Sequence, residues 1–135
     1  MAYFEWTDDL SVKIPTIDDQ HKKLIGMIND FYDSFKSGRN KEQLVELVIG
    51  LKDYTSYHFS TEEGLLTQHG YPGFGSHKEQ HVAFVEKVND FQQRMESGKL
   101  VVSLEVTNFL KDWLSNHIKK TDQEYSSFLI GKGVQ

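Results

Sequence analysis

Residues 58–81 read HFSTEEGLLTQHGYPGFGSHKEQH, and this stretch carries two pairs of potential metal ligands. His58 and Glu62 are four residues apart, and so are His77 and His81. Side chains with this spacing lie one above the other on the same face of a helix. If the stretch is helical at both ends, each pair can bind one metal centre from its own helix.

Helical periodicity extends outward from this stretch in both directions. Gly70 and Pro72 predict a break between the two ligand pairs. Elsewhere, apolar residues recur at helical spacing up to further glycines and short polar connections. Residues 1–17 are expected to form an irregular N-terminal arm. The helices are expected at roughly 18–37, 41–69, 77–97 and 103–129.

Residues that commonly cap helices stand near three of the expected starts. Asn40 precedes the second helix and can accept a hydrogen bond from its first turn. Ser76 and Glu79 have the spacing of a capping box for the third helix. Possible caps of the first helix are Thr16, Asp18 and Asp19.

Short connections between the helices determine the expected fold class. A short loop returns each helix along its predecessor, so the sequence predicts an all-α, up-down-up-down antiparallel four-helix bundle. The chain has 135 residues, of which 38% are apolar. This length and composition suit one domain, residues 1–135, with a single substantial core.

Composition and charge disfavour several classes of partner. The net charge of −5 is spread through the chain without a basic stripe, so neither nucleic acid nor anionic lipid is expected to bind. No signal peptide and no run of about 18 apolar residues is visible, so we expect a cytoplasmic protein without a membrane anchor. The absence of cysteine excludes disulfides and thiolate ligands.

The predicted topology brings potential ligands from all four helices to one end of the bundle. One histidine lies near the start of the first helix. One pair lies on each side of the turn between the second and third helices, and a histidine and an aspartate lie late in the fourth helix. These residues are His21, His58, Glu62, His77, His81, His117 and Asp122. For any single histidine, a hydrogen bond to a neighbour or exposure to solvent is an equally good explanation. The matched positions of all seven favour a metal site, whereas His69 fits no such series and is assigned a surface or capping role.

The donor types restrict the metal. Imidazole and carboxylate without thiolate suit iron, zinc, copper or manganese, and so many histidines exclude a calcium or magnesium site. Seven donors are too many for one tetrahedral zinc, but two metals can share them if the carboxylates bridge. His77 and His81 lack the glutamate that follows the first histidine of a zincin. The Glu-x-x-His motif of ferritin-like di-iron proteins is also absent.

The spacing of His117 and Asp122 differs from that of the other pairs. Five residues correspond to about 140° of rotation on a regular α-helix, which would point the two side chains apart. We therefore expect a π-type widening or a bend near residues 117–122. Tyr54 and Tyr125 face the predicted core nearby, and packing is their favoured role over donating hydrogen bonds to the site.

The complete set of motifs resembles the hemerythrin family, particularly its single-domain bacterial members, the bacteriohemerythrins. The resemblance covers almost the whole chain: the arm Trp6–Val12, the run Ile17–His21, and the patterns His58-Phe59-x-x-Glu62, His77-x-x-x-His81 and His117-Ile118-x-x-x-Asp122. It implies two non-haem iron ions. Three histidines would bind one iron (His77, His81 and His117) and two the other (His21 and His58). Glu62, Asp122 and an oxo or hydroxo group would bridge both irons.

The same resemblance implies a function. The second iron has one histidine fewer, and its open position would bind dioxygen reversibly for oxygen carriage, storage or delivery, without enzymatic turnover. An apolar dioxygen pocket is expected from Leu24, Phe59, Trp113, Leu114 and Ile118. The alternatives are an oxygen or redox sensor domain excised from a signalling protein, and a di-iron enzyme acting on peroxide or nitric oxide. The resemblance names no protein partner.

Overall fold

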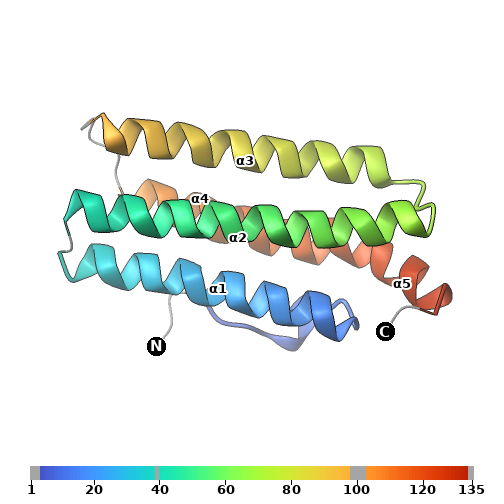
Figure 1. Ribbon diagram of the computed structural model, residues 1–135. Coiled ribbons are helices and arrows are strands. Elements are labelled where there is room, and N and C mark those ends of the chain that lie inside the picture. The colour runs from blue at the N-terminus through green and yellow to red at the C-terminus, as the bar shows by residue number, and fades with distance from the viewer. Residues whose placement is uncertain (1–3, 39, 98–102, 134–135) are drawn as a thin grey trace.

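The computed structural model describes residues 4–38, 40–97 and 103–133, and it is an up-down-up-down bundle (Figure 1). Within these ranges the chain forms helices and no strand. The helices are α1 (Pro15–Lys36), α2 (Lys41–Gln68), α3 (Phe74–Glu96), α4 (Ser103–Asn116) and α5 (Gln123–Gly131). A π-helical turn, His117–Asp122, joins α4 to α5, and these three segments together form the fourth rod of the bundle. None of the described helices is both long and apolar enough to cross a membrane.

The starts of two helices differ from the sequence prediction. α1 begins at Pro15, whose fixed φ suits the first helical position and whose missing N–H costs nothing there. The proposed caps Thr16, Asp18 and Asp19 therefore lie inside the helix, and that prediction was wrong. α3 begins at Phe74 after Gly73, so the predicted capping box of Ser76 and Glu79 does not form either.

Asn40 caps α2 as predicted. Its side chain accepts a hydrogen bond from the backbone N–H of Gln43 at 2.9 Å. The side chain of Gln43 accepts one in return from the backbone N–H of Asn40 at 3.2 Å. This reciprocal pair satisfies two backbone donors at the start of the helix.

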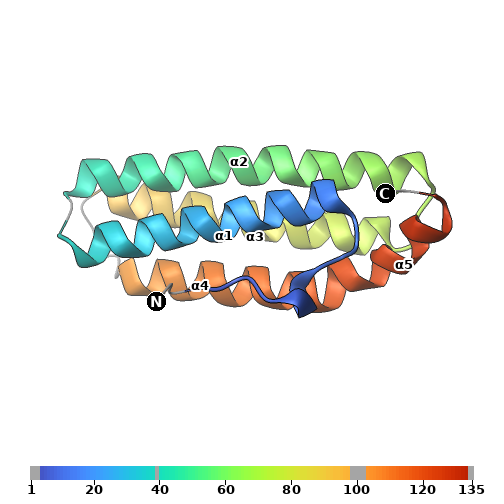
Figure 2. The ribbon, with the colours of Figure 1, turned by 90° about the horizontal axis from the view of Figure 1, so that it is seen from below.

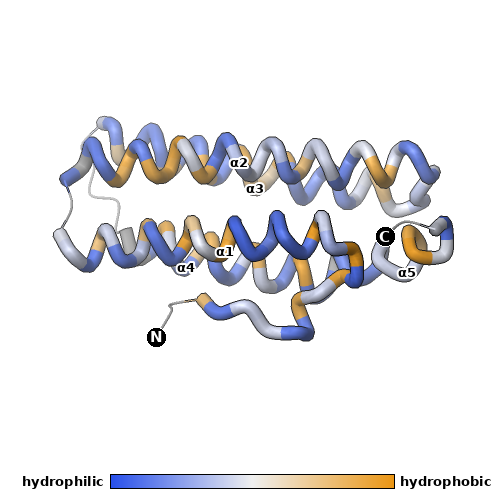
Figure 3. The backbone as a smooth tube through the Cα atoms, turned by 60° about the horizontal axis from the view of Figure 1, so that its bottom comes forward, coloured by the Kyte–Doolittle hydropathy of each residue, from blue (hydrophilic) through white to orange (hydrophobic). Residues whose placement is uncertain are grey.

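The apolar core is divided into two parts. The larger cluster runs along the bundle and includes Phe31, Phe84 and Phe91. The smaller cluster lies near the α2–α3 turn and includes Leu66 and Leu129. Figure 3 shows hydrophobic and hydrophilic residues alternating along the helices, as expected for rods that bury one face. On α2, Phe59 belongs to the larger cluster and Leu66 to the smaller, so the residues between them lie where the two clusters meet.

The N-terminal arm packs against the bundle. Figure 2 shows it running past α4 to the start of α1. At one end of the arm, Asn29 of α1 forms two hydrogen bonds of 2.8 Å with the backbone of Phe4. At the other end, Asp18 accepts hydrogen bonds from the backbone N–H of Val12 at 2.8 Å and from the hydroxyl of Ser11 at 2.6 Å. These bonds hold the arm against α1, from Asn29 to the first turn of the helix.

Candidate metal centre

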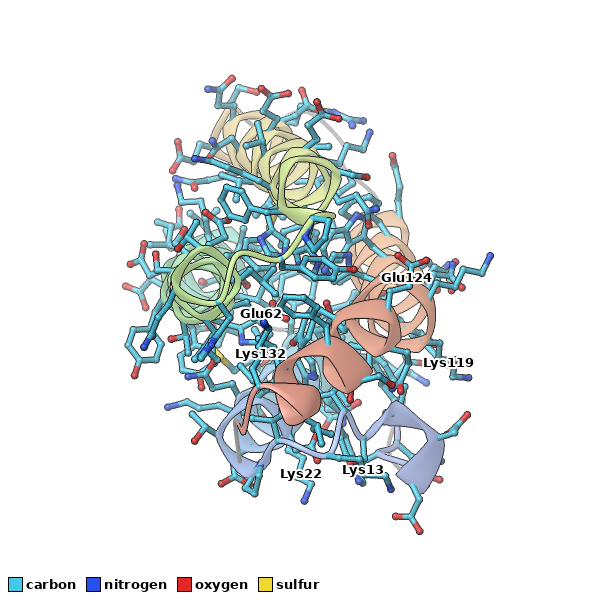
Figure 4. All side chains as sticks on the ribbon, turned by 90° about the vertical axis from the view of Figure 1, so that its right-hand side faces the viewer. Lys13, Lys22, Glu62, Lys119, Glu124 and Lys132 are labelled. Carbon is cyan, nitrogen blue, oxygen red and sulfur yellow. The ribbon has the colours of Figure 1, made fainter. Side chains whose placement is uncertain are left out.

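All seven predicted ligands converge at one level of the bundle. They come from α1 (His21), α2 (His58 and Glu62), α3 (His77 and His81) and the π turn (His117 and Asp122). All are buried, and even the most exposed of them, His117, exposes only 3% of its surface. Figure 4 looks along the bundle from this end and shows Glu62 between the helices, whereas Lys22 and Lys119 lie at the periphery.

The donor atoms fall into two groups that share Glu62. One group contains Glu62, His77, His81 and His117, and the other contains His21, His58 and Glu62. Within each group the donor atoms lie within 4.8 Å of one another, close enough to hold one metal ion. Histidines divide three to two between the groups.

Asp122 contacts histidines of the same two groups. One oxygen, Oδ2, lies 3.1 Å from Nε2 of His21. The other oxygen, Oδ1, lies 3.1 Å from Nε2 of His117 and 3.3 Å from Nε2 of His77. The two carboxylates therefore each contact histidines of both groups, as bridging ligands must.

The π turn makes this contact possible. Widening the backbone over His117–Asp122 brings both side chains to the same face of the fourth rod, so that they lie 3.1 Å apart despite their five-residue spacing. The predicted widening of the helix at this position is confirmed.

Several buried polar atoms of the site have no hydrogen-bond partner among the described residues. They are both ring nitrogens of His21 and of His77, Oε1 of Glu62, and both carboxylate oxygens of Asp122. Their close contacts have ion-pair distances but not hydrogen-bond geometry. Buried polar atoms are nearly always satisfied, so a cluster of this size points to a missing partner. A cation between the two groups would supply it.

The hydrogen bonds of the outer ring nitrogens support the same conclusion. Nδ1 of His58 lies 2.6 Å from Oε1 of Gln20, and Nδ1 of His117 lies 2.9 Å from Oε1 of Gln80. Nδ1 of His81 lies 2.8 Å from Oε2 of Glu63. Since these oxygens accept, each Nδ1 carries the proton in the neutral ring and each Nε2 presents a lone pair to the site.

This tautomer leaves two lone pairs facing each other. Nε2 of His81 and Nε2 of His117 are 3.2 Å apart, and neither carries a proton to place between them. The contact is unfavourable in an empty site and favourable when both nitrogens bind one metal ion. The donor set therefore fits a metal.

With the exception of His21, the pKa shifts favour the protonation states of metal ligands. Burial lowers the pKa of His77, and lowers that of His81 to about 2, so both imidazoles are neutral. Burial would raise the pKa of the two carboxyls, but the histidines around Glu62 and Asp122 lower both. For His21, burial would lower the pKa, but the neighbouring Asp122 raises it above the ordinary value and so favours the protonated ring. Neutral imidazoles and ionised carboxylates are the forms that bind metals.

Three of the five predicted pocket residues line one cavity, and the other two lie outside its lining. Leu24, Phe59 and Leu114 line a small apolar cavity inside the bundle. Ile118 is fully buried in the larger core cluster. Trp113, in contrast, stacks on the ring of His117, with centroids 4.4 Å apart and an angle of 13° between the rings.

Four polar neighbours of the site were not predicted as site residues. Gln20, Glu63 and Gln80 contact the outer nitrogens of the histidines, and Tyr125 donates a hydrogen bond of 2.5 Å to Oε2 of Glu62. The prediction that Tyr125 only packs in the core was therefore wrong. The three others stand beside ligands in the sequence, where polar residues are common on any helix, so no sequence signal distinguished them.

A family model described as the hemerythrin HHE cation binding domain matches residues 12–129. The chain belongs to the hemerythrin family. A bacteriohemerythrin of Pseudomonas aeruginosa is 37% identical over 93% of this chain and 80% of its own length. A bacteriohemerythrin of Methylococcus capsulatus is 34% identical, over 96% of this chain and 98% of its own length. The match to the hemerythrin model includes all seven buried donor residues and both ends of the π turn.

The hemerythrin fold is also found by comparison of structures. A solved wild-type hemerythrin is 33% identical and superposes with a TM-score of 0.89, covering 95% of this chain and 98% of that chain. The helical bundle is therefore that of a hemerythrin.

Proposed function

We propose that this site holds two iron ions and that the chain binds dioxygen reversibly there, for oxygen carriage, storage or delivery. The observation that carries the proposal is the pair of donor groups sharing Glu62, one with three histidines and the other with two. His77, His81 and His117 would bind one iron, and His21 and His58 the other. Glu62 and Asp122 would bridge them, together with an oxo or hydroxo group. Membership of the hemerythrin family and the bacteriohemerythrin relatives support this assignment.

The unequal division of histidines gives the two halves different roles. When bound, the iron pair supplies two reducing equivalents and an open coordination position for dioxygen. The group with His21 and His58 offers one histidine fewer, so this side of the site has room for an exogenous ligand. The two carboxylates neutralise part of the metal charge, which makes a buried centre tolerable.

Apolar side chains would keep water away from that side. Leu24, Phe59 and Leu114 line a cavity of about 10 Å³, close to the smallest volume that admits one water-sized molecule. A diatomic gas suits such an apolar space better than water, which would lose its hydrogen bonds there. Exclusion of water and protons favours release of dioxygen unchanged over chemical turnover.

Tyr125 would act as a fixed donor to the bridge. Its hydroxyl donates to Oε2 of Glu62. Burial raises its pKa well above 10, so the group stays protonated. It can therefore orient the carboxylate but cannot serve as a base.

The test is an optical titration of the full chain, loaded with iron and reduced under anaerobic conditions. Spectra are recorded before oxygen, after oxygen, and after oxygen is stripped away. Visible charge-transfer bands that appear with oxygen and vanish on its removal, with two irons per chain, are the expected result. Bands that persist after removal would overturn reversible binding and favour redox sensing or catalysis.

A further inference from the structure

The acceptors of the three outer ring nitrogens are chemically unequal. Gln20 and Gln80 offer neutral amide oxygens to His58 and His117, whereas Glu63 offers a carboxylate oxygen to His81. A charged acceptor forms a stronger hydrogen bond than a neutral one. It also increases electron density on the imidazole, and so makes Nε2 a stronger metal donor.

The geometry holds His81 in one orientation. Its ring stacks on Phe59 with centroids 3.7 Å apart and an angle of only 3° between the planes. The edge of the ring meets Glu63, whose Oε2 lies 2.8 Å from Nδ1. One contact fixes the plane of the imidazole, and the other fixes its rotation within that plane.

Glu63 also differs from Gln20 in its access to solvent. Its side chain is 24% exposed and lines a groove between α2 and α3, together with Lys78 and Glu86. Gln20, in contrast, is buried. Glu63 therefore connects the outer edge of a buried histidine to the protein surface.

We propose that Glu63 is a positioning residue of the metal centre: it holds His81 with Nε2 directed at the metal and, through its charge, makes His81 a stronger donor than His58 or His117. This inference rests on the proposed metal centre but not on dioxygen binding. As a consequence, the carboxylate stabilises the more highly charged oxidation state of the bound metal. Loss of the carboxylate weakens metal binding and raises the midpoint potential of the iron centre.

The experiment compares the wild-type chain with Glu63→Gln, Glu63→Ala and the control Glu86→Gln, each loaded with zinc. Zinc does not bind dioxygen or change oxidation state, so the comparison is independent of oxygen chemistry. Proton–nitrogen NMR of the zinc form detects the Nδ1–H of His81. In the wild type we expect a low-field signal protected from exchange with water. Glu63→Gln should move this signal to higher field and Glu63→Ala should abolish it, whereas Glu86→Gln should leave it unchanged.

Metal affinity and potential provide the second readout. Competition with a chromophoric chelator should show a 10–100-fold loss of zinc affinity in Glu63→Ala, the range typical for a hydrogen-bond partner of a metal ligand, and a smaller loss in Glu63→Gln. Voltammetry of the iron-loaded chains should show a higher midpoint potential in Glu63→Gln. Because this variant retains an acceptor and removes only the charge, a merely structural role of Glu63 would leave the potential unchanged.

The outcomes separate the two proposals. Fewer than two metal ions bound per wild-type chain would overturn the proposed di-iron centre. Two bound ions together with wild-type NMR signal, affinity and potential in both Glu63 variants would overturn the role of Glu63 alone. A change of equal size in Glu86→Gln would also overturn it, because the effect would then follow from surface charge.

Discussion

At the scale of single residues, Glu62 is the most connected donor of the site. Its oxygens lie 2.9 Å from Nε2 of His58 and 3.6 Å from Nε2 of His81, and Tyr125 donates to one of them. A carboxylate buried to this degree is tolerable only when charge and hydrogen bonds compensate it. Each neighbour of Glu62 is therefore expected to affect both stability and metal binding.

The hydroxyl of Tyr125 provides the first prediction. Tyr125→Phe removes the donor and leaves a buried carboxylate oxygen with one hydrogen bond fewer. We expect the free energy of unfolding of the iron-loaded chain to fall by about 1–3 kcal/mol, measured by urea denaturation. Tyr57→Phe serves as the control, since Tyr57 is 61% exposed and its change should have little effect. Equal stability of the two variants would contradict the role of the Tyr125 hydroxyl.

Ile118 provides the second prediction. This residue follows His117 and is fully buried, so Ile118→Glu places a carboxylate inside the bundle beside the proposed centre. The new carboxylate should compete for the open position and abolish stable oxygenation. Visible spectra with and without oxygen measure this, with Ile118→Leu as the apolar control. Unchanged dioxygen spectra in the glutamate variant would show that Ile118 does not border the binding position.

At the scale of elements, the π turn decides whether the fourth rod can supply two ligands. Insertion of one alanine after Lys120, which is exposed within the turn, lengthens the step from His117 to Asp122 to six residues and should rotate Asp122 by about 100° relative to His117. We expect fewer than two irons per chain, measured by metal analysis of the purified protein. Lys120→Ala keeps the length of the turn and should still bind two. Full iron content in the insertion variant would show that the spacing within the turn does not decide metal binding.

The arm is the other element whose attachment can be tested. Asp18 joins it to the first turn of α1 through two hydrogen bonds, and its charge is favourable near a helix N-terminus. Asp18→Ala should speed hydrogen exchange at the Val12 amide and cost about 1–3 kcal/mol. Asp19→Ala, at the exposed neighbouring position, is the matched control. An unchanged exchange rate at Val12 in Asp18→Ala would mean that other contacts hold the arm.

The sequence predicted the elements better than their ends. Spacing of apolar residues and short connections were sufficient for the bundle, and the five-residue step from His117 to Asp122 was sufficient for the π turn, because both follow from helix geometry. The starts of α1 and α3 were missed because several neighbouring residues can cap a helix, and contacts with other parts of the chain determine where the helix begins. The acceptors of the outer histidine nitrogens were missed for a similar reason, since each of the three lies on a different helix from the histidine that it contacts.

At the scale of the whole molecule, the proposed metal is expected to contribute to folding. A ligand that binds only the folded state stabilises it by about 2.7 kcal/mol when its free concentration is about 100 times Kd. For a domain of this size the melting temperature should therefore fall by several degrees on metal removal. Calorimetry of the chain with iron, without iron, and after iron is restored measures this. Identical melting temperatures would contradict a buried metal centre.

Burial of the donors also has a kinetic consequence. Because His21 and Asp122 are fully enclosed and the most exposed donor shows only 3% of its surface, a chelator cannot reach a bound ion while the helices remain packed. Exchange of the ion with solution must wait for a local opening of the bundle. The exchange rate should then become independent of chelator concentration and equal the rate of opening. The packing of the four helices, and not only the strength of the metal–ligand bonds, would therefore determine how long the chain retains its metal.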